Sequence, residues 1–215
     1  MRDIVIFGCG GFGREILQIL LDQNAERPRW KILGFLVSPE VQASELVQGL
    51  PVKRAIAEFG SPETLAFAIG LGNPEARRKV VSDLRTSGVT QFPALVHPRA
   101  WLGANVEMSE GVVICAGALL TTDIVLGEHS HVNIGTTIGH DAIVGSYSTL
   151  SPGVHVSGRV TLQDGVEIGT GACLNPGVTI GRGAVIGAAA AVLRDVPAGC
   201  TAVGVPAKVI KHPLD

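Results

Sequence analysis

Aliphatic residues recur at every sixth position from Leu102 to Val192 without an interruption. A second register, four positions after each of these residues, holds small or β-branched side chains. A period of six fits neither the 3.6-residue period of a helix nor the two-residue alternation of a long strand. It predicts short parallel strands that bend once per hexad, with three hexads closing each coil of a triangular solenoid of about five coils. The first register consists of Leu102, Met108, Ile114, Leu120, Leu126, Val132, Ile138, Val144, Leu150, Val156, Leu162, Ile168, Leu174, Ile180, Ile186 and Val192.

Glycine, asparagine or serine follows the aliphatic residue in most hexads, as at Gly103, Asn133 and Gly139. These residue types tolerate a positive φ or bond their own backbone in a turn, so the chain is expected to bend there. Many of the 28 glycines therefore have a structural role. Burial of the aliphatic register, at roughly 1.5–3 kcal/mol per side chain, is enough to order this half of the chain.

The N-terminal part of the chain shows a different pattern. Residues 3–8 form a continuous apolar run typical of a buried strand, Gly-Cys-Gly-Gly-Phe-Gly follows, and residues 14–22 have helical periodicity. A strand, a glycine turn and a helix in this order aim backbone N–H groups at an anion, which indicates nucleotide binding. Further strands are expected over 30–37 and 64–71, and a helix follows Gly72-Asn73-Pro74. This pattern predicts a truncated parallel α/β unit of three or four strands.

Composition narrows the function. A formal charge of −2 and a pI near 6.3 give no basic surface for nucleic acid. No apolar run approaches the roughly 18 residues of a membrane span, and the N-terminus lacks a signal-peptide layout, so we expect a soluble cytoplasmic protein. The four cysteines have no paired close spacing, which favours reduced thiols over a zinc site or a disulfide framework. His97, beside Pro98, is interpreted as a packed residue of the connector rather than a ligand.

Five segments together carry a resemblance to a known family. They are Ile6 to Glu15, Ala68 to Lys79, Val96-His97-Pro98, Ile138-Gly139-His140-Asp141 and the terminal Gly-Val-Pro-Ala-Lys. With these segments the chain resembles the hexapeptide-repeat sugar O-acyltransferases, a family that includes sialic acid O-acetyltransferases and N-acetyltransferases of nucleotide-linked 4-amino sugars. The resemblance implies a Rossmann-like nucleotide-sugar-binding domain at 1–88, a connector at 89–101, a left-handed parallel β-helix at 102–196 and a C-terminal cap at 197–215. It also implies a homotrimer with the co-substrate acetyl-CoA between two subunits, and no metal.

The resemblance assigns roles to particular residues. His140, assisted by Asp141, would take a proton from the acceptor amine or hydroxyl, and a neutral imidazole on an outward-facing corner is a competent base near pH 7. Thr149 stands where the family usually has a histidine, and Val37 and Ser38 replace an acidic pair that grips the nucleotide. The contacts implied for acetyl-CoA are Thr149, Gly158, Thr170 and Ala188. Those implied for the nucleotide-sugar are Gly8, Gly10, Gly11, Phe12, Val37, Ser38, Gly72 and Asn73.

The resemblance thus implies acetyl transfer to the amine of a nucleotide-linked 4-amino-4,6-dideoxy sugar, in surface-polysaccharide or glycan precursor synthesis. A sugar O-acetyltransferase and a non-catalytic nucleotide-sugar-binding trimer are the open alternatives. A dehydrogenase is disfavoured because no acidic residue ends the second strand. A γ-carbonic-anhydrase-like hydratase needs converging imidazoles, and no two of His129, His131, His140 and His155 are separated by eighteen or thirty-six residues, the spacing that stacks side chains on one edge.

Overall fold

A computed structural model describes residues 1–212 of the chain, which divides into two compact units. The first unit contains residues 1–72 and 76–98, and the second contains residues 73–75 and, as far as the structure describes the chain, 99–212. The division at Pro98 falls inside the connector expected over 89–101. Residues 213–215 of the expected C-terminal cap lie outside the described residues.

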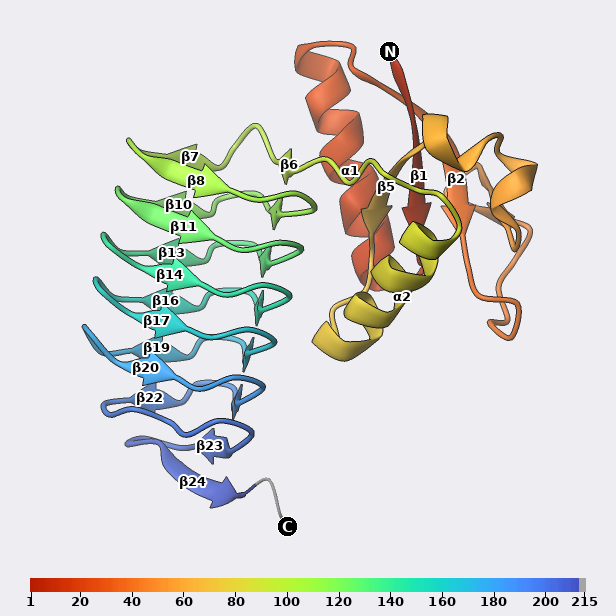
Figure 1. The fold of residues 1–215 in the computed structure, drawn as a ribbon. Helices are drawn as coiled ribbons and strands as arrows, with labels where there is room; N and C mark the ends of the chain where they lie inside the picture. Colours follow the sequence, from red (N-terminus) through yellow and green to blue (C-terminus); the bar gives the residue numbers. More distant parts are fainter. Residues whose placement is uncertain (213–215) are drawn as a thin grey trace. The chain divides into compact units, whose positions relative to one another are not determined.

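The first unit is built on a five-stranded sheet with the order β3-β4-β2-β1-β5, of which Figure 1 labels β2, β1 and β5. Strands β4, β2, β1 and β5 are parallel, which agrees with the expected α/β unit. The core includes Ile4 and Ile6 of β1, Ile16 and Leu20 of α1, and Phe67 of β5, all fully buried. The elements are β1 (Arg2–Phe7), α1 (Gly11–Glu26), β2 (Trp30–Leu36), β3 (Leu46–Val47), β4 (Leu50–Lys53), η1 (Ile56–Glu58), η2 (Pro62–Thr64), β5 (Ala66–Ile69), α2 (Pro74–Thr86) and β6 (Leu95–Val96).

A short hairpin lies between the strands expected over 30–37 and 64–71. Strand β3 pairs antiparallel with β4, and Gln48 and Gly49 at the turn both have positive φ, 48° and 78°. Two such residues in succession make the tight turn that suits a two-residue hairpin loop. The strands are too short for alternation to reveal them, and Pro51 further weakens the strand signal.

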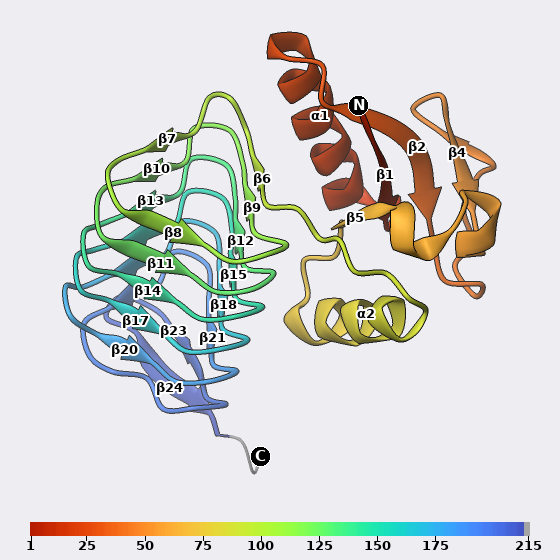
Figure 2. The same ribbon diagram turned by 45° about the horizontal axis from the view of Figure 1, so that its top comes forward.

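The second unit is the expected solenoid, a parallel β-helix with three faces (Figures 1 and 2). Face I contains β7 (Trp101–Leu102), β10 (Leu119–Leu120), β13 (Thr137–Ile138), β16 (His155–Val156), β19 (Cys173–Leu174) and β22 (Ala191–Val192). Face II contains β8 (Val106–Met108), β11 (Ile124–Leu126), β14 (Ile143–Val144), β17 (Thr161–Leu162) and β20 (Thr179–Ile180). Face III contains β9 (Val113–Ile114), β12 (His131–Val132), β15 (Thr149–Leu150), β18 (Glu167–Ile168), β21 (Val185–Ile186) and β23 (Thr201–Val203), followed by antiparallel β24 (Lys208–Lys211).

Both sixfold registers point into the solenoid. In the first register every member is buried except Leu102, which is half-buried, and Met108, which is 38% exposed. These two residues belong to the first coil. In the second register Ala118, Ser130, Thr136 and Ser148 are fully buried, so small side chains fill the space beside the large ones. Residues eighteen apart pair between successive coils, as His131 does with Thr149.

The bends differ from the expectation in one respect. Positive φ falls on the third residue after the aliphatic position, as at Asp123, Asp141 and Gly153, and not on the first. The glycine at the first position is needed for another reason: a Cβ there would meet the backbone of the next coil. At Gly139 it would lie 2.6 Å from the nitrogen of Gly158, closer than real Cβ contacts allow. The interpretation of these glycines as the positive-φ residues of the bend was therefore wrong.

Candidate active site

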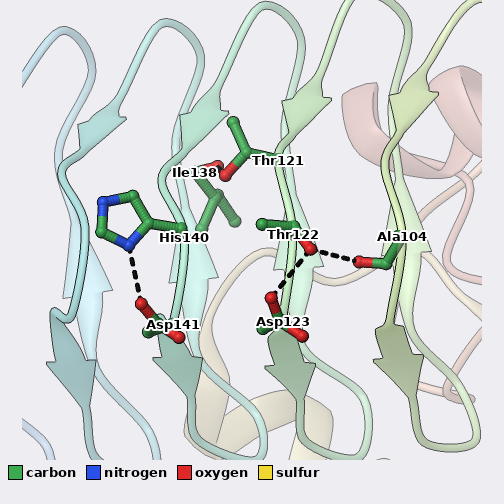
Figure 3. Close-up of polar contacts among 7 residues, drawn as sticks. All are labelled: Ala104, Thr121, Thr122, Asp123, Ile138, His140 and Asp141. Carbon is green, nitrogen blue, oxygen red and sulfur yellow. Dashed lines mark hydrogen bonds and ion pairs between the residues drawn. The ribbon is translucent and has the colours of Figure 1, made fainter.

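His140 lies on the corner of the solenoid between β13 on face I and β14 on face II. Its side chain is 53% exposed, and its Nδ1 atom is 2.7 Å from Oδ2 of Asp141 (Figure 3). Asp141 is the residue with positive φ in this corner, 59°, a conformation that aspartate tolerates better than most residues. An ionised carboxylate can only accept, so Nδ1 carries the hydrogen of the neutral ring and Nε2 keeps its lone pair.

Gly158, one coil further on, leaves room for the imidazole. A Cβ at Gly158 would lie 2.6 Å from Nε2 of His140 and 2.7 Å from Cε1. The backbone of this coil is tied to the preceding coil by the Arg159 N–H, which donates to His140 O at 2.8 Å. The second position of a hexad accepts a Cβ elsewhere in the solenoid, so the need for glycine is specific to the coil beside His140. Alanine occupies this position at Ala104, Ala116 and Ala188.

A second carboxylate, Asp123, lies one coil before Asp141 (Figure 3). Asn105 Nδ2 donates to its Oδ1 at 2.8 Å, and Thr122 Oγ1 lies 2.9 Å from its Oδ2. These hydrogen bonds, that of Asn105 first, hold the pKa of Asp123 below its usual range, and the charge of His140 acts in the same direction. Sequence reasoning missed Asp123, although its distance of eighteen residues from Asp141 was a signal that could have found it.

The residues predicted to contact acetyl-CoA do not gather at one corner. Thr149 lies on β15 of face III and is 8% exposed. Thr170 and Ala188 are exposed and stack on the corner between faces III and I, where the Ala189 N–H donates to Thr170 O at 2.8 Å. Gly158 is on the corner of His140 instead. Within one chain, face I therefore separates the two predicted groups.

The residues predicted to bind the nucleotide-sugar lie in the first unit, apart from Asn73, which the division places in the second. A cavity of about 560 Å³ is lined by Gly8, Gly10, Val37 and Ser38, together with Lys79 and other residues. The remaining predicted residues are not among those that line the cavity: Gly11 and Phe12 begin α1, and Gly72 and Asn73 precede α2.

The glycine run brings the start of α1 close to β1. A Cβ at Gly13 would lie only 1.9 Å from Gly8 O, so no other residue fits without moving the backbone. Gly10 precedes α1 without a side-chain cap, and the first turn carries no acidic residue. The helix N-terminus therefore lacks a side-chain cap, and the first turn of a helix is a place where backbone N–H groups bind a phosphate. Lys79, which also lines the cavity, pairs with Asp83 at 2.8 Å, and this hydrogen bond raises the pKa of Lys79.

Two further sequence expectations concern side chains outside these sites, those of His97 and of the cysteines. His97 is packed, 5% exposed, with its Nε2 atom 2.8 Å from Oδ2 of Asp22. The four cysteines form no disulfide, and Cys173 is exposed. Among residues 1–212, no group of three or more His, Cys, Asp or Glu side chains is arranged to hold a metal ion, and no helix is long and apolar enough to cross a membrane.

Comparison with known proteins agrees with this architecture. Residues 3–84 match the PglD N-terminal domain family. The chain is 30% identical over 156 residues to GDP-perosamine N-acetyltransferase of Escherichia coli O157:H7, covering 72% of this chain and 70% of that protein. The chain belongs to the hexapeptide-repeat sugar acyltransferase family. The resemblance carried by the five sequence segments is thereby confirmed.

Solved structures of similar acyltransferases extend over nearly the whole chain. The acetyltransferase domain of PglB from Neisseria gonorrhoeae FA1090, in complex with acetyl coenzyme A, is 30% identical with a TM-score of 0.84, and the match covers 97% of this chain and 99% of that one. PerB from Caulobacter crescentus, in complex with CoA and GDP-perosamine, is 27% identical with a TM-score of 0.87, and the match covers 98% of each chain. The predicted fold class, a Rossmann-like unit followed by a left-handed β-helix, is therefore confirmed.

Proposed function

We propose that this acyltransferase moves the acetyl group of acetyl-CoA to the amine of a nucleotide-linked 4-amino-4,6-dideoxy sugar, with His140 as the general base. The observation that carries the proposal is the hydrogen bond of 2.7 Å from His140 Nδ1 to Asp141, which leaves Nε2 as a proton acceptor on an exposed corner. Similar proteins, named as N-acetyltransferases of GDP-perosamine or solved with acetyl coenzyme A, support this substrate class.

The transfer is direct. The sugar amine nitrogen attacks the thioester carbonyl carbon, a C–N bond forms, and the amine gives its proton to His140 Nε2. The C–S bond then breaks, and the proton passes to the departing CoA thiolate. General-base assistance of this kind contributes roughly 10²- to 10⁴-fold to a rate. No covalent acyl-enzyme is invoked, because Cys115 and Cys173 lie on hexads other than that of His140.

The backbone beside His140 offers a donor for the negative charge that develops on the carbonyl oxygen. The Gly158 N–H makes none of the hydrogen bonds found within residues 1–212. It belongs to the coil against which the imidazole rests, so one corner holds both a proton acceptor and a proton donor. A backbone N–H fixed in this way stabilises an oxyanion without reorganisation during the reaction.

The proposed site is shared between subunits of a trimer. Face I separates Thr170 and Ala188 from His140 within one chain, so one acetyl-CoA reaches both corners when a second chain contributes one of them. Exposed apolar side chains on faces I and II support burial between copies: Leu119 is 45% exposed and Ile143 is 48% exposed. Light scattering is expected to report three chains of 22.3 kDa each, and a monomer would contradict this part of the proposal.

A thiol-release assay tests the activity. The purified protein is mixed with acetyl-CoA and a panel of GDP-, UDP- and dTDP-linked 4-amino sugars, and free CoA thiol is measured with a thiol reagent. Release that depends on one amino-sugar acceptor, with N-acetylated product seen by mass spectrometry, is the expected result. A matched acceptor with a hydroxyl in place of the amine should release no thiol. Nucleotide-sugar binding without thiol release would favour a non-catalytic protein.

A further inference from the structure

Asp123 is an exposed carboxylate on the same edge of the solenoid as His140 and Asp141 (Figure 3). Asp141 N–H donates to Thr122 O at 3.2 Å, and Asp123 N–H donates to Ala104 O at 3.1 Å, so the corners stack coil on coil. Asp123 and Asp141 have nearly the same backbone conformation, with φ of 55° and 59°. Two carboxylates therefore stand on consecutive coils: Asp141 is hydrogen-bonded to the imidazole, and Asp123 lies on the coil before it, whereas the ring rests against Gly158 on the coil after it.

Neighbouring polar groups fix Asp123 in its charged form and in position. Asn105 Nδ2 donates to one oxygen at 2.8 Å. Thr122 Oγ1 lies 2.9 Å from the other oxygen and 3.0 Å from Ala104 O, so its hydroxyl donates to one of these two at a time. Hydrogen bonds to the ionised form keep the pKa of Asp123 below its usual range, and its negative charge is present throughout the neutral range.

We propose that Asp123 is a second carboxylate of the active site, a positioning residue that acts through His140. Its charge stabilises the imidazolium that forms when His140 accepts the proton of the sugar amine. This inference rests on the proposed function, because the imidazolium forms only if His140 is the general base of the acetyl transfer. Asp123 touches neither substrate in this account, and it accepts no proton itself.

Other charges near His140 set the size of the effect. Segments 119–126, 137–144 and 155–162 flank His140 on its own coil and on the two adjacent coils. Their other titratable side chains are Asp123, Asp141, His155 and Arg159. His155 is bonded to Thr137 on face I at 2.9 Å, whereas the exposed Arg159 opposes the two carboxylates. The field at His140 therefore depends on two negative charges and one positive charge, and removing Asp123 takes away one of the two negative charges.

The test compares wild-type protein with Asp123→Asn, which keeps the shape of the side chain, can still accept from Asn105, and tolerates positive φ. The first readout is the titration of the His140 imidazole, followed by NMR in protein free of substrates. Its midpoint is expected to fall in the variant, because one neighbouring negative charge is lost, and the difference should shrink in 1 M salt. A midpoint that does not move would overturn the proposal, whether or not the protein proves to be an acetyltransferase.

The second readout is the pH profile of kcat/KM in the thiol-release assay. In Asp123→Asn, the acid limb should move to lower pH in parallel with the NMR midpoint, and the plateau should fall about 2- to 5-fold because the base is weaker. Asp164→Asn is the matched control: Asp164 accepts from Ser146 N–H at 3.0 Å on a different corner, and its loss should move neither readout. If the Asp123→Asn variant has a lower plateau kcat/KM but the acid limb of its pH profile stays at the wild-type pH, the proposal is contradicted and Asp123 has a structural role.

Discussion

Two glycines, one in each unit, show how differently the same residue serves this protein. Gly13 in the α/β unit has no room for a Cβ because the backbone carbonyl of Gly8 would lie 1.9 Å away. Gly158 in the solenoid has no room because the His140 ring would lie 2.6 Å away. A backbone carbonyl cannot move without the strand, whereas a half-exposed imidazole can turn aside. The first glycine is therefore required by the fold, and the second by the position of a side chain.

The two units also build their candidate sites in different ways. The cavity of the α/β unit is lined by segments that are far apart in the sequence, around Gly8, Val37 and Lys79. The corner around His140 arises from residues eighteen apart that stack on consecutive coils. The first arrangement depends on how loops meet over the carboxyl ends of strands. The second arrangement follows the repeat of the solenoid. The residues beside any corner residue can therefore be found by counting eighteen positions along the sequence.

Replacement of His140 by alanine should have the largest effect on turnover. His140→Ala removes the proton acceptor, so kcat is expected to fall by roughly 10²- to 10⁴-fold. Folding and acetyl-CoA binding should persist, because the side chain is half exposed and contributes little to the core. Steady-state kinetics, a thermal melt and calorimetric titration of CoA measure these three quantities. His155→Ala, an exposed histidine on the next coil, should change kcat by less than about 2-fold; unchanged turnover in His140→Ala would remove His140 from the mechanism.

Replacement of Gly13 by alanine should have the next largest effect, on stability. The added Cβ cannot fit beside Gly8 O, and Gly70 also packs against Gly13, so the turn, α1 and β5 must shift together. Gly13→Ala is expected to lower the free energy of unfolding by about 2–4 kcal/mol, as measured in denaturant. Gly11→Ala is the control, since a Cβ there meets nothing within 4 Å. Equal stability of the two variants would show that the turn adapts.

Replacement of Gly158 by alanine should separate activity from stability. Alanine fits this position elsewhere in the solenoid, as at Ala104 and Ala188, so the melting temperature should hardly change. The Cβ would push the imidazole from its place, and a displacement of about 1 Å is enough to lower kcat by roughly 10- to 100-fold. A Gly158→Ala variant with lower stability and intact kcat would contradict this prediction. Gly158 would then be required by the fold, as Gly13 is, and not by the position of the imidazole.

The sequence revealed most of the solenoid because every hexad meets the same environment. The aliphatic residue faces the interior once in six positions, so a single pattern predicts the strands, the bends and the outward direction of His140. The predicted position of positive φ within the bend was wrong. A glycine such as Gly139 can be required either by positive φ or by the close approach of another backbone segment, and the sequence pattern is the same in both cases. Only the backbone of the next coil distinguishes them, and that contact is not visible in one hexad.

The α/β unit was less predictable because its segments do not share one repeated environment, and contacts between distant segments decide part of its structure. The pattern indicated β1, α1 and β2, which have strong local signals, and missed the hairpin of β3 and β4, which depends on pairing with β2. Of the residues that line the cavity, the family resemblance had named Gly8, Gly10, Val37 and Ser38. Lys79 was seen as part of a helix, but nothing in the sequence showed that this helix lines the cavity.

Replacement of Lys79 by methionine should have the smallest effect, confined to nucleotide-sugar binding. Lys79 lines the cavity, and its raised pKa keeps it charged at neutral and moderately alkaline pH. Lys79 is a surface charge that would attract the nucleotide phosphates, so Lys79→Met is expected to raise KM for the nucleotide-sugar about 5-fold. Because protonation is complete below its usual pKa, this ratio should stay constant between about pH 6 and pH 9 and shrink as salt is added.

The kinetic split between this variant and Gly158→Ala tests whether the two sites act separately. Lys79→Met should leave kcat within about 2-fold of wild type, since a group that binds substrate and transition state equally changes KM alone. Lys31→Met, which removes an exposed charge paired with Asp3 at 3.6 Å, is the matched control and should leave KM unchanged. A fall in kcat with an unchanged KM in Lys79→Met would place this lysine near the reacting atoms, and the α/β unit would then serve catalysis as directly as the corner of His140.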